Sequence, residues 1–474
     1  MWIILSFLLP ALGSIPVFRM TDDRKRHRLT ATLVIGASLL AVFAAKFGTA
    51  CTLLRLSDTL SLRFAADGLS LFFVVLVSLI WCFVQFHAFG YMVHEGKEGR
   101  FFGFFLLTYA TLVALSFAKN VATLYMCFEL MTLSSMPMVL HNGTKQSRRA
   151  ALAYLGYSTL GAALALMGFF VLASKGVSLE FVSGGVNIPG DPSLFAAAFL
   201  IVLGFGAKAG LVPLQMWLTE AHPVAPSPAS AVLSGLITKG GVISIIRCVF
   251  FLFGAERLRG TWVQTAVLVL AVITIFTGSM LAQREKLLKK RLAYSTVSNV
   301  SYVLFGLFSF EALGITGALL QVVFHALAKD ALFLCAGSVI FATGKTKVDE
   351  LRGIGRQMPV TMWCFAIASL SLIGIPPMGG FIAKWYLALG ALRGGTGLGV
   401  VGVVTLMVSA LLTAFYLMPI VASAFFPGRD YETGERCEVP RTMLVPQLVF
   451  AGLTVLLGMF PMRLLISFFT GLLL

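Results

Sequence analysis

The sequence predicts an all-α polytopic membrane protein, and three features predict it: the composition, the long apolar stretches and the placement of the basic residues. Of its 474 residues, 58% are hydrophobic and 12% are charged, and the mean hydropathy is +0.92. A soluble domain carries roughly a quarter charged residues. This composition therefore excludes a water-soluble globular enzyme and indicates a chain that crosses a membrane many times.

Apolar stretches of about 17 or more residues are long enough to cross a bilayer as helices. The sequence contains fourteen such stretches, each of which we expect to form a membrane-spanning helix. They are residues 2–18, 29–47, 67–91, 101–117, 120–141, 150–173, 195–218, 224–253, 261–283, 292–310, 312–343, 359–393, 396–426 and 444–470.

The basic residues between these stretches predict the orientation of the chain. Loops after odd-numbered stretches contain 22 Lys and Arg residues, and loops after even-numbered stretches contain 10. By the positive-inside rule the odd loops face the cytoplasm, so both termini face outward. No basic residue precedes the first stretch and Arg19 follows it, which favours a retained helix over a cleaved signal peptide. The net charge of +16 is therefore mostly a topology signal, and we expect no nucleic-acid partner.

We single out five ionisable residues deep inside the predicted spans. A lysine at the bilayer centre costs about 2.5–3.5 kcal/mol. Lys208 is about ten residues from the end of its span, roughly 15 Å along a helix, which is too deep for its ammonium group to reach the interface. One such residue could be a structural accident, but several in one chain favour a path for protons or charge. The five are Glu129, Lys208, Lys239, Lys329 and Lys384.

Prolines predict that the seventh and twelfth helices are broken. Pro213 follows Lys208, and Pro376 and Pro377 precede Lys384. Proline removes an intrahelical hydrogen bond and clashes with the carbonyl four residues back. Because the two helices are five apart, an odd offset, we expect two five-helix repeats of inverted topology, as in many transporters. Two unrelated kinks are the alternative.

The repeats define the predicted organisation of the chain. Residues 1–100 form helices one to three, 101–253 the first repeat (helices four to eight), 261–426 the second, inverted repeat (helices nine to thirteen), and 427–474 a C-terminal loop and helix fourteen.

Several motifs occur in an order that resembles one known family. They are Phe128-Glu129-Leu-Met, Leu218-Thr-Glu-Ala-His222-Pro-Val-Ala-Pro226-Ser-Pro228, Lys290-Arg-Leu-Ala-Tyr-Ser295 and Phe324-His325-Ala-Leu-Ala-Lys329-Asp-Ala-Leu-Phe333. They look like the motifs of the antiporter-like subunits of respiratory complex I, of the large Mrp sodium/proton antiporter subunits and of energy-converting hydrogenases. The resemblance covers roughly residues 65–425 and agrees with a fold of fourteen helices.

The resemblance implies a role for each matching residue. Glu129 resembles the acid that pairs with the seventh-helix lysine, here Lys208, and Lys239 resembles the bridging lysine of helix eight. His325 and Lys329 would share one face of helix eleven and continue the path. Lys384 resembles the terminal residue of the path, on the outward side of helix twelve.

Two further positions leave questions open. Asn299 stands where the family usually has histidine, and an asparagine can hold a water but cannot titrate. His222, in the short turn before Pro223, is either a proton entrance or a cap for the broken helix.

The expected mechanism is proton transfer along these side chains. Desolvation disfavours the charged form of a buried lysine and a nearby carboxylate favours it, so movement of Glu129 relative to Lys208 could switch Lys208 between holding and releasing a proton. We recognise no C-x-x-C pair and no phosphate-binding loop, and we expect no cofactor and no bound metal ion, Na⁺ included, in this chain. Partner subunits would therefore supply the energy.

Three function classes remain open at this point. The first is a proton-translocating subunit of a redox complex of the complex I or hydrogenase type, which has other membrane-arm subunits and redox subunits as partners. The second is a subunit of a multi-subunit cation/proton antiporter without a redox partner. The third is a stand-alone solute carrier or a structural anchor. In each case we expect a multi-pass protein of the cell membrane.

Overall fold

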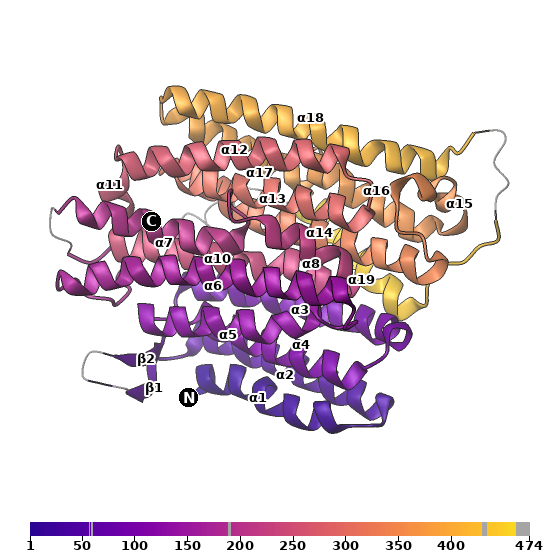
Figure 1. Cartoon of the computed structure of the whole chain (residues 1–474), viewed down its shortest axis with the longest axis horizontal. Helices are drawn as coiled ribbons and strands as arrows, with labels where there is room; N and C mark the ends of the chain where they lie inside the picture. The colour runs from indigo at the N-terminus through magenta and orange to yellow at the C-terminus, as the bar shows by residue number, and fades with distance from the viewer. Residues whose placement is uncertain (56, 58–59, 188–190, 429–433, 461–474) are drawn as a thin grey trace.

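The computed structural model describes residues 1–55, 57, 60–187, 191–428 and 434–460. The long helices lie side by side and roughly parallel, from α1 and α2 at one edge to α18 at the opposite edge (Figure 1). Ten helices of the described residues are long and apolar enough to cross a membrane. The chain is therefore a mostly helical, multi-pass membrane protein.

The N-terminal part contains three long helices and a hairpin. The helices are α1 (Trp2–Arg19), α2 (Asp23–Phe47) and α3 (Gly68–Glu95). Between α2 and α3, strands β1 (Cys51–Arg55) and β2 (Ser61–Phe64) pair antiparallel. Their backbone groups lie outside any helix and satisfy their hydrogen bonds with each other. The hairpin is thus an addition to the all-α architecture that the sequence predicts, and it lies at the same end of the bundle as the N-terminus (Figure 1).

Helices of the next segment pack in chain order. These are α4 (Glu98–Ser116), α5 (Val121–Val139), α6 (Lys145–Ser174) and α7 (Ser193–Ala209), and each contacts the next. A Cβ added to Gly161 on α6 would lie 2.5 Å from the carbonyl oxygen of Gly204 on α7. The absence of side chains at these two positions allows the two backbones to approach closely.

The seventh predicted helix is interrupted, as its proline predicts. Helix α7 ends at Ala209, and Gly210 has a positive φ of 84°. The chain resumes as a helix only at α8 (Met216–Val224), so Pro213 lies in the break. The eighth span then runs through consecutive segments that together cover Ser227–Phe253: α9 (Ser227–Val232), the π-helix η1 (Leu233–Ile237), α10 (Thr238–Cys248) and the π-helix η2 (Val249–Phe253).

The second half of the chain also contains helices that pack together and one interrupted helix. Helix α12 contacts α13, α13 contacts α14, and α14 contacts both α16 and α17. Helix α16 ends at Ile373, Gly374 has a φ of 90°, and Pro376 and Pro377 lie before the start of α17, which confirms the predicted break. The elements are α11 (Ala255–Leu258), α12 (Trp262–Arg284), α13 (Leu288–Leu307), α14 (Ala312–Thr343), η3 (Val348–Leu351), α15 (Ile354–Gln357), α16 (Pro359–Ile373), α17 (Gly379–Arg393), α18 (Gly397–Phe425) and α19 (Arg441–Met459).

Helix α14 is the centre of the bundle. It packs against α3, α9, α13, α16, α17 and α19, and it is buried on every face between Gly314 and Val339, apart from partial exposure at Val323. A helix that is apolar all round belongs inside a bundle, so its polar residues must find partners in neighbouring helices. The last predicted span, 444–470, corresponds to α19 up to Met459, and its residues 461–470 lie outside the described residues.

Candidate functional site

Lys208 is held by hydroxyl groups at the end of α7. It is fully buried, and its Nζ donates to Thr132 Oγ1 on α5 at 2.8 Å. On α6 it donates to Tyr154 OH at 2.7 Å and to Ser158 Oγ at 3.0 Å. The Nζ also lies 4.0 Å from the centroid of the Tyr154 ring, close enough for a cation–π interaction. These groups and the carbonyl end of α7 can stabilise an ammonium group within the bundle.

Glu129 lies one turn before Thr132 on α5 and is half-buried. It interacts electrostatically with Lys208, but all three hydrogen bonds of the lysine go to hydroxyls. Among the described residues no carboxylate forms an ion pair with Lys208. The direct pairing that we expect between Glu129 and Lys208 therefore stays a prediction for another state of the protein.

Lys239 and His325 form one of the contacts between the two halves of the chain. Lys239 Nζ lies 2.6 Å from His325 Nδ1, and both side chains are buried. The same Nζ donates to the carbonyl oxygen of Ser234 at 2.8 Å. Ser234 lies in the π-helix η1, and such segments change the carbonyl pattern and occur often at functional sites.

Lys329 points toward α13. Its Nζ donates to the carbonyl oxygen of Leu292 at 2.8 Å and also contacts Ser295 Oγ. The amide of Asn299 donates to the Ser295 carbonyl at 2.8 Å, and Gln321 donates to Asn299 Oδ1 at 3.2 Å. Asn299 thus links Lys329 to Gln321 through hydrogen bonds.

A small cavity, too narrow to hold a water molecule in this structure, lies between this cluster and the broken helix α16–α17. Polar residues of α13, α14 and α16 line the cavity. Leu372 also lines it, and the carbonyl oxygen of Leu372 accepts a hydrogen bond from Lys384. The cavity therefore separates His325 from the group that binds Lys384. Its lining residues are Asn299, Gln321, Phe324, His325, Ser371, Leu372 and Gly380.

Lys384 binds the end of α16 across the break. Its Nζ donates to the carbonyl oxygens of Leu372 at 2.8 Å and Ile373 at 2.7 Å. The last carbonyls of a helix have no intrahelical partner and carry partial negative charge, so they favour a cation. The side chain is half-buried, and its Nζ lies 5.3 Å from the centroid of the Tyr302 ring.

His222 is buried on α8 and stacks on Phe333, with ring centroids 4.7 Å apart. Neither ring nitrogen has a hydrogen-bond partner among the residues described, so the ring caps no helix in this structure. Lys289, only 7% exposed, donates to the carbonyl of Ala225 just beyond α8. Sequence reasoning missed Lys289 as a buried residue because it belongs to a run of basic residues in a loop between two predicted spans.

Asp330 is the most significant residue that the sequence interpretation missed. It follows Lys329 on α14 and is fully buried. The signal was present, because Asp330 is an acidic residue deep inside a predicted span, as Glu129 is. The hydroxyl partners of Lys208 carried no comparable signal, because Thr132, Tyr154 and Ser158 resemble ordinary helix residues.

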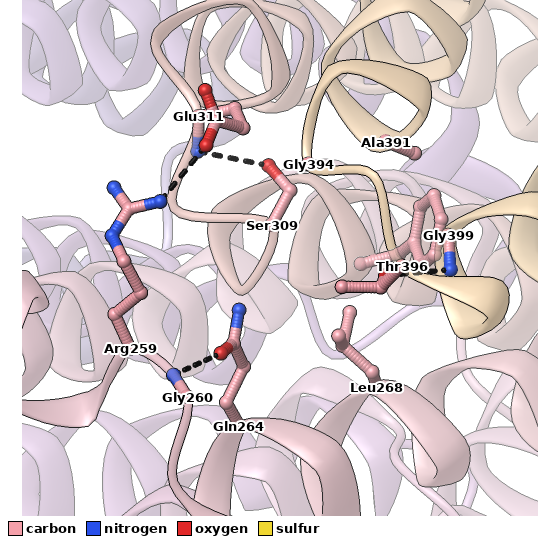
Figure 2. A pocket seen from close by; sticks show the side chains of 11 residues that line it. Arg259, Gly260, Gln264, Leu268, Ser309, Glu311, Ala391, Gly394, Thr396 and Gly399 are labelled. Atoms are coloured by element: carbon pink, nitrogen blue, oxygen red, sulfur yellow. Dashed lines mark hydrogen bonds and ion pairs between the residues drawn. The ribbon is translucent and has the colours of Figure 1, made fainter.

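A pocket of about 190 Å³ lies at the end of α17. Figure 2 shows Arg259 and Glu311 on one side of it and Thr396 and Gly399 on the other. Arg259 Nη1 donates to Glu311 Oε1 at 2.8 Å. The loops that line the pocket follow even-numbered predicted helices, so the predicted orientation assigns the pocket to the outer side.

Comparison with known proteins agrees with this geometry. A family model described as "NADH:quinone oxidoreductase/Mrp antiporter, TM" matches residues 118–413, and one described as "NADH-Ubiquinone oxidoreductase (complex I), chain 5 N-terminus" matches residues 56–102. The NADH-quinone oxidoreductase subunit N of Desulforudis audaxviator is 35% identical over 379 residues, which are 77% of this chain and 75% of that protein.

Two other relatives come from different complexes. The hydrogenase-4 component B of Escherichia coli is 32% identical over 90% of this chain, which spans 65% of that protein's length. A Na(+)/H(+) antiporter subunit of Alkalihalophilus pseudofirmus is 28% identical over 96% of this chain and 93% of its own.

Solved structures share the fold at low sequence identity. A chain of the Mrp complex from Dietzia sp. superposes with a TM-score of 0.83 at 21% identity, covering 99% of this chain and 96% of its own. A chain of respiratory complex I from Thermus thermophilus gives 0.82 at 22% identity, covering 99% of both chains. The chain therefore belongs to the family of antiporter-like membrane subunits of NADH:quinone oxidoreductases and Mrp antiporters.

Proposed function

We propose that this chain is a proton-translocating, antiporter-like subunit of a membrane-bound redox complex of the complex I or hydrogenase type. The observation that carries the proposal is the series of basic groups inside the bundle, two of which, Lys239 and His325, are in direct contact at its centre. The groups that we assign to this path are Glu129, Lys208, Lys239, His325, Lys329 and Lys384, with His222 as the entrance.

The first step would take place between Glu129 and Lys208. A carboxylate that approaches the lysine favours its charged form, and withdrawal of the carboxylate favours release of the proton. Lys208 and Lys239 lie on helices that pack together, since a Cβ added to Gly241 on α10 would lie 3.1 Å from Lys208 Cβ. This packing supports transfer from the first half-path to the centre.

The second part of the path would run from the centre to the outer side. Lys239 contacts His325 directly, and Lys329 reaches Asn299 and Gln321 through Ser295. The small cavity that Asn299, Gln321 and His325 share with Leu372 has no room for a water molecule in this structure, so proton transfer to Lys384 would require the cavity to widen in another state of the protein. The outer pocket beside Glu311 would receive the proton.

We further propose fourteen membrane spans in two inverted repeats, residues 101–253 and 261–426. The packing orders α4, α5, α6, α7 and α12, α13, α14, α16 correspond, and α7 and α16 each end at a glycine of positive φ. The four spans beyond the ten long apolar helices would be α5, α7–α8, α13 and α16–α17. Spans α7–α8 and α16–α17 are interrupted by their breaks, α5 contains Glu129, and α13 contains three consecutive basic residues near its start. Both termini would face outward from the plasma membrane.

The partners would be other membrane-arm subunits and a redox module. The relatives at 35% and 32% identity, a quinone oxidoreductase subunit and a hydrogenase component, support this assignment. One observation favours the alternative of an Mrp-type Na⁺/H⁺ antiporter: the match to the Na(+)/H(+) antiporter protein of Alkalihalophilus pseudofirmus, at 28% identity, covers nearly the full length of both chains.

Purification of the complex from its host membranes would distinguish these functions. We expect an affinity tag on this chain to recover redox subunits, identified by mass spectrometry. In liposomes, the recovered complex should acidify or alkalinise the lumen when the substrate of those subunits is oxidised. Recovery of membrane subunits alone, with proton movement driven only by a Na⁺ gradient, would establish the antiporter instead. Recovery of the chain without partners would contradict both.

A further inference from the structure

Asp330 has no hydrogen-bond partner in the middle of the bundle. It is 0% exposed, and neither of its carboxyl oxygens makes a hydrogen bond within the described residues. Another buried acid, Glu98, shows the usual solution, because it contacts Arg26 and His27. An ionised carboxylate without such a partner is very costly to bury. Asp330 must therefore be neutral, or a nearby cation must compensate its charge.

The carboxyl group of Asp330 lies against the π-helix η1, at a glycine that leaves space for it. A Cβ added to Gly235 would lie 2.3 Å from Asp330 Oδ2 and 2.4 Å from Oδ1. Gly235 is the residue after Ser234, whose carbonyl oxygen accepts the hydrogen bond from Lys239. The carboxyl group thus lies beside the segment that holds Lys239.

Lys239 is the cation that faces Asp330. The two interact electrostatically, although they form no ion pair of 4.0 Å or less in this structure. The neighbouring Lys329 lies on the same helix but points away, toward Leu292 on α13. His325 contacts Lys239 through Nδ1, and its Nε2 has no partner among the described residues. His222 on α8 interacts electrostatically with Lys289 and Lys329.

We propose that Asp330 is a further proton-carrying residue of the path, and that it exchanges a proton with Lys239 across the π-helix η1. The carboxylic acid would give its proton to the neutral amine and become a carboxylate, while Lys239 becomes an ammonium; the return of the proton restores both neutral groups. This inference rests on the proton path proposed above.

The exchange solves an electrostatic problem at the centre of the bundle. Lys239 and His325 are both bases, so a proton that reaches them adds a net positive charge in a medium of low dielectric constant. Once the pair has passed its shared proton onward, Asp330 is left as a carboxylate and the pair carries one negative charge; a proton that then arrives from Lys208 makes the pair neutral again, whichever of the two groups holds it. Asp330 would then determine how readily Lys239 accepts the proton that arrives from Lys208.

The test is Asp330→Asn in the assembled complex, with Asp349→Asn as the matched control. Asp349 lies in η3, shortly after α14, and is exposed. We expect Asp330→Asn to assemble normally and to lower proton translocation at least tenfold, while Asp349→Asn has no effect. Infrared difference spectra should show a protonated carboxyl band that shifts in D₂O, is present in the control and is lost in Asp330→Asn.

Other outcomes separate this inference from the proposed function. If Asp330→Asn translocates protons at the wild-type rate, or if its carboxyl band persists, the role of Asp330 is overturned. If Lys239→Ala nevertheless abolishes translocation, the proposed path itself stands. Normal translocation in both variants would overturn the path. If Asp330→Asn does not assemble, Asp330→Glu keeps a carboxyl group. It should then show a displaced band and retain measurable translocation, and absence of the band would contradict the proposal.

Discussion

At the scale of single residues, Lys384 separates a proton relay from a structural anchor. Its ammonium group donates to the carbonyls of Leu372 and Ile373, and an arginine could make similar hydrogen bonds. An arginine does not release its proton at any workable pH. We therefore expect Lys384→Arg to insert and assemble normally but to lose proton translocation by at least tenfold in liposomes. Lys46→Arg, in the last turn of α2, is the control and should be silent. Full translocation by Lys384→Arg would remove Lys384 from the path.

A second prediction at this scale concerns Glu129 and Lys208. Both Glu129→Gln and Lys208→Ala should abolish or strongly reduce translocation, because the first removes the moving charge and the second removes the proton carrier. Neither should prevent assembly, since Thr132 and Tyr154 keep other hydrogen-bond partners without Lys208, and Glu129 is half-buried and forms no ion pair within the described residues. Structures of the working complex should show a state with the two groups in contact. Separation beyond about 8 Å in every state, with no bridging water, would contradict the pairing.

The site residues differ in how well sequence could predict them. A lysine such as Lys208 is visible because charge is rare in apolar stretches, and its depth excludes an interfacial position. Its partners are not visible, because Thr132, Tyr154 and Ser158 come from other helices and acquire meaning only through packing. Asp330 could be predicted by the rule that identifies Glu129, a charged residue deep inside an apolar stretch. Its position against Gly235 could be found only from the structure.

At the scale of elements, the two breaks depend on glycines of positive φ. Gly210 and Gly374 have φ of 84° and 90°, where an L-residue is strained by about 1–2 kcal/mol. A Cβ at Gly210 would also lie 2.6 Å from Leu218 Cδ1, and one at Gly374 3.0 Å from Lys384 Cδ. We expect Gly210→Ala and Gly374→Ala each to lower the apparent melting temperature of the detergent-solubilised complex.

The matched control is Gly156→Ala on α6, where an added Cβ has no atom within 4 Å. Alanine is the better helix former there, so stability should be unchanged or higher. Gly374→Ala should in addition impair translocation, because the new methyl group contacts the side chain of Lys384. Equal stability of Gly374→Ala and the wild type would show that the break does not require the left-handed conformation.

The elements themselves were predictable where a local physical rule fixes them. The prolines at 213, 376 and 377 cannot continue a helix hydrogen-bond pattern, and the structure places breaks there. The β1–β2 hairpin and the π-helix η1 had no comparable local signal. The hairpin depends on pairing between Cys51 and Phe64 across a short connection, and η1 packs directly against α14, a contact that only the tertiary structure defines.

At the scale of the whole molecule, the distribution of basic residues predicts a single orientation. The predicted outer side includes the β1–β2 hairpin, the pocket beside Glu311 and the N-terminus; the hairpin and the N-terminus lie at one end of the bundle (Figure 1). The direction in which Lys384 would deliver protons depends on this orientation. Two native cysteines can report it, because Cys51 and Cys437 lie in connections outside the helices and are half-buried.

We expect a membrane-impermeant maleimide to label Cys51 from outside in intact cells, and to label Cys437 only after permeabilisation. Burial raises the pKa of both thiols above the ordinary value. Because the thiolate is the reactive form, labelling at both positions should be slow at neutral pH and should become faster as the pH rises. Cys51→Ser and Cys437→Ser identify the two signals by mass spectrometry, and the buried cysteines of the helices should remain unlabelled. Labelling of Cys437 in intact cells, with protection of Cys51, would show that the orientation in the membrane is the reverse of the predicted one. Lys384 would then face the cytoplasmic side.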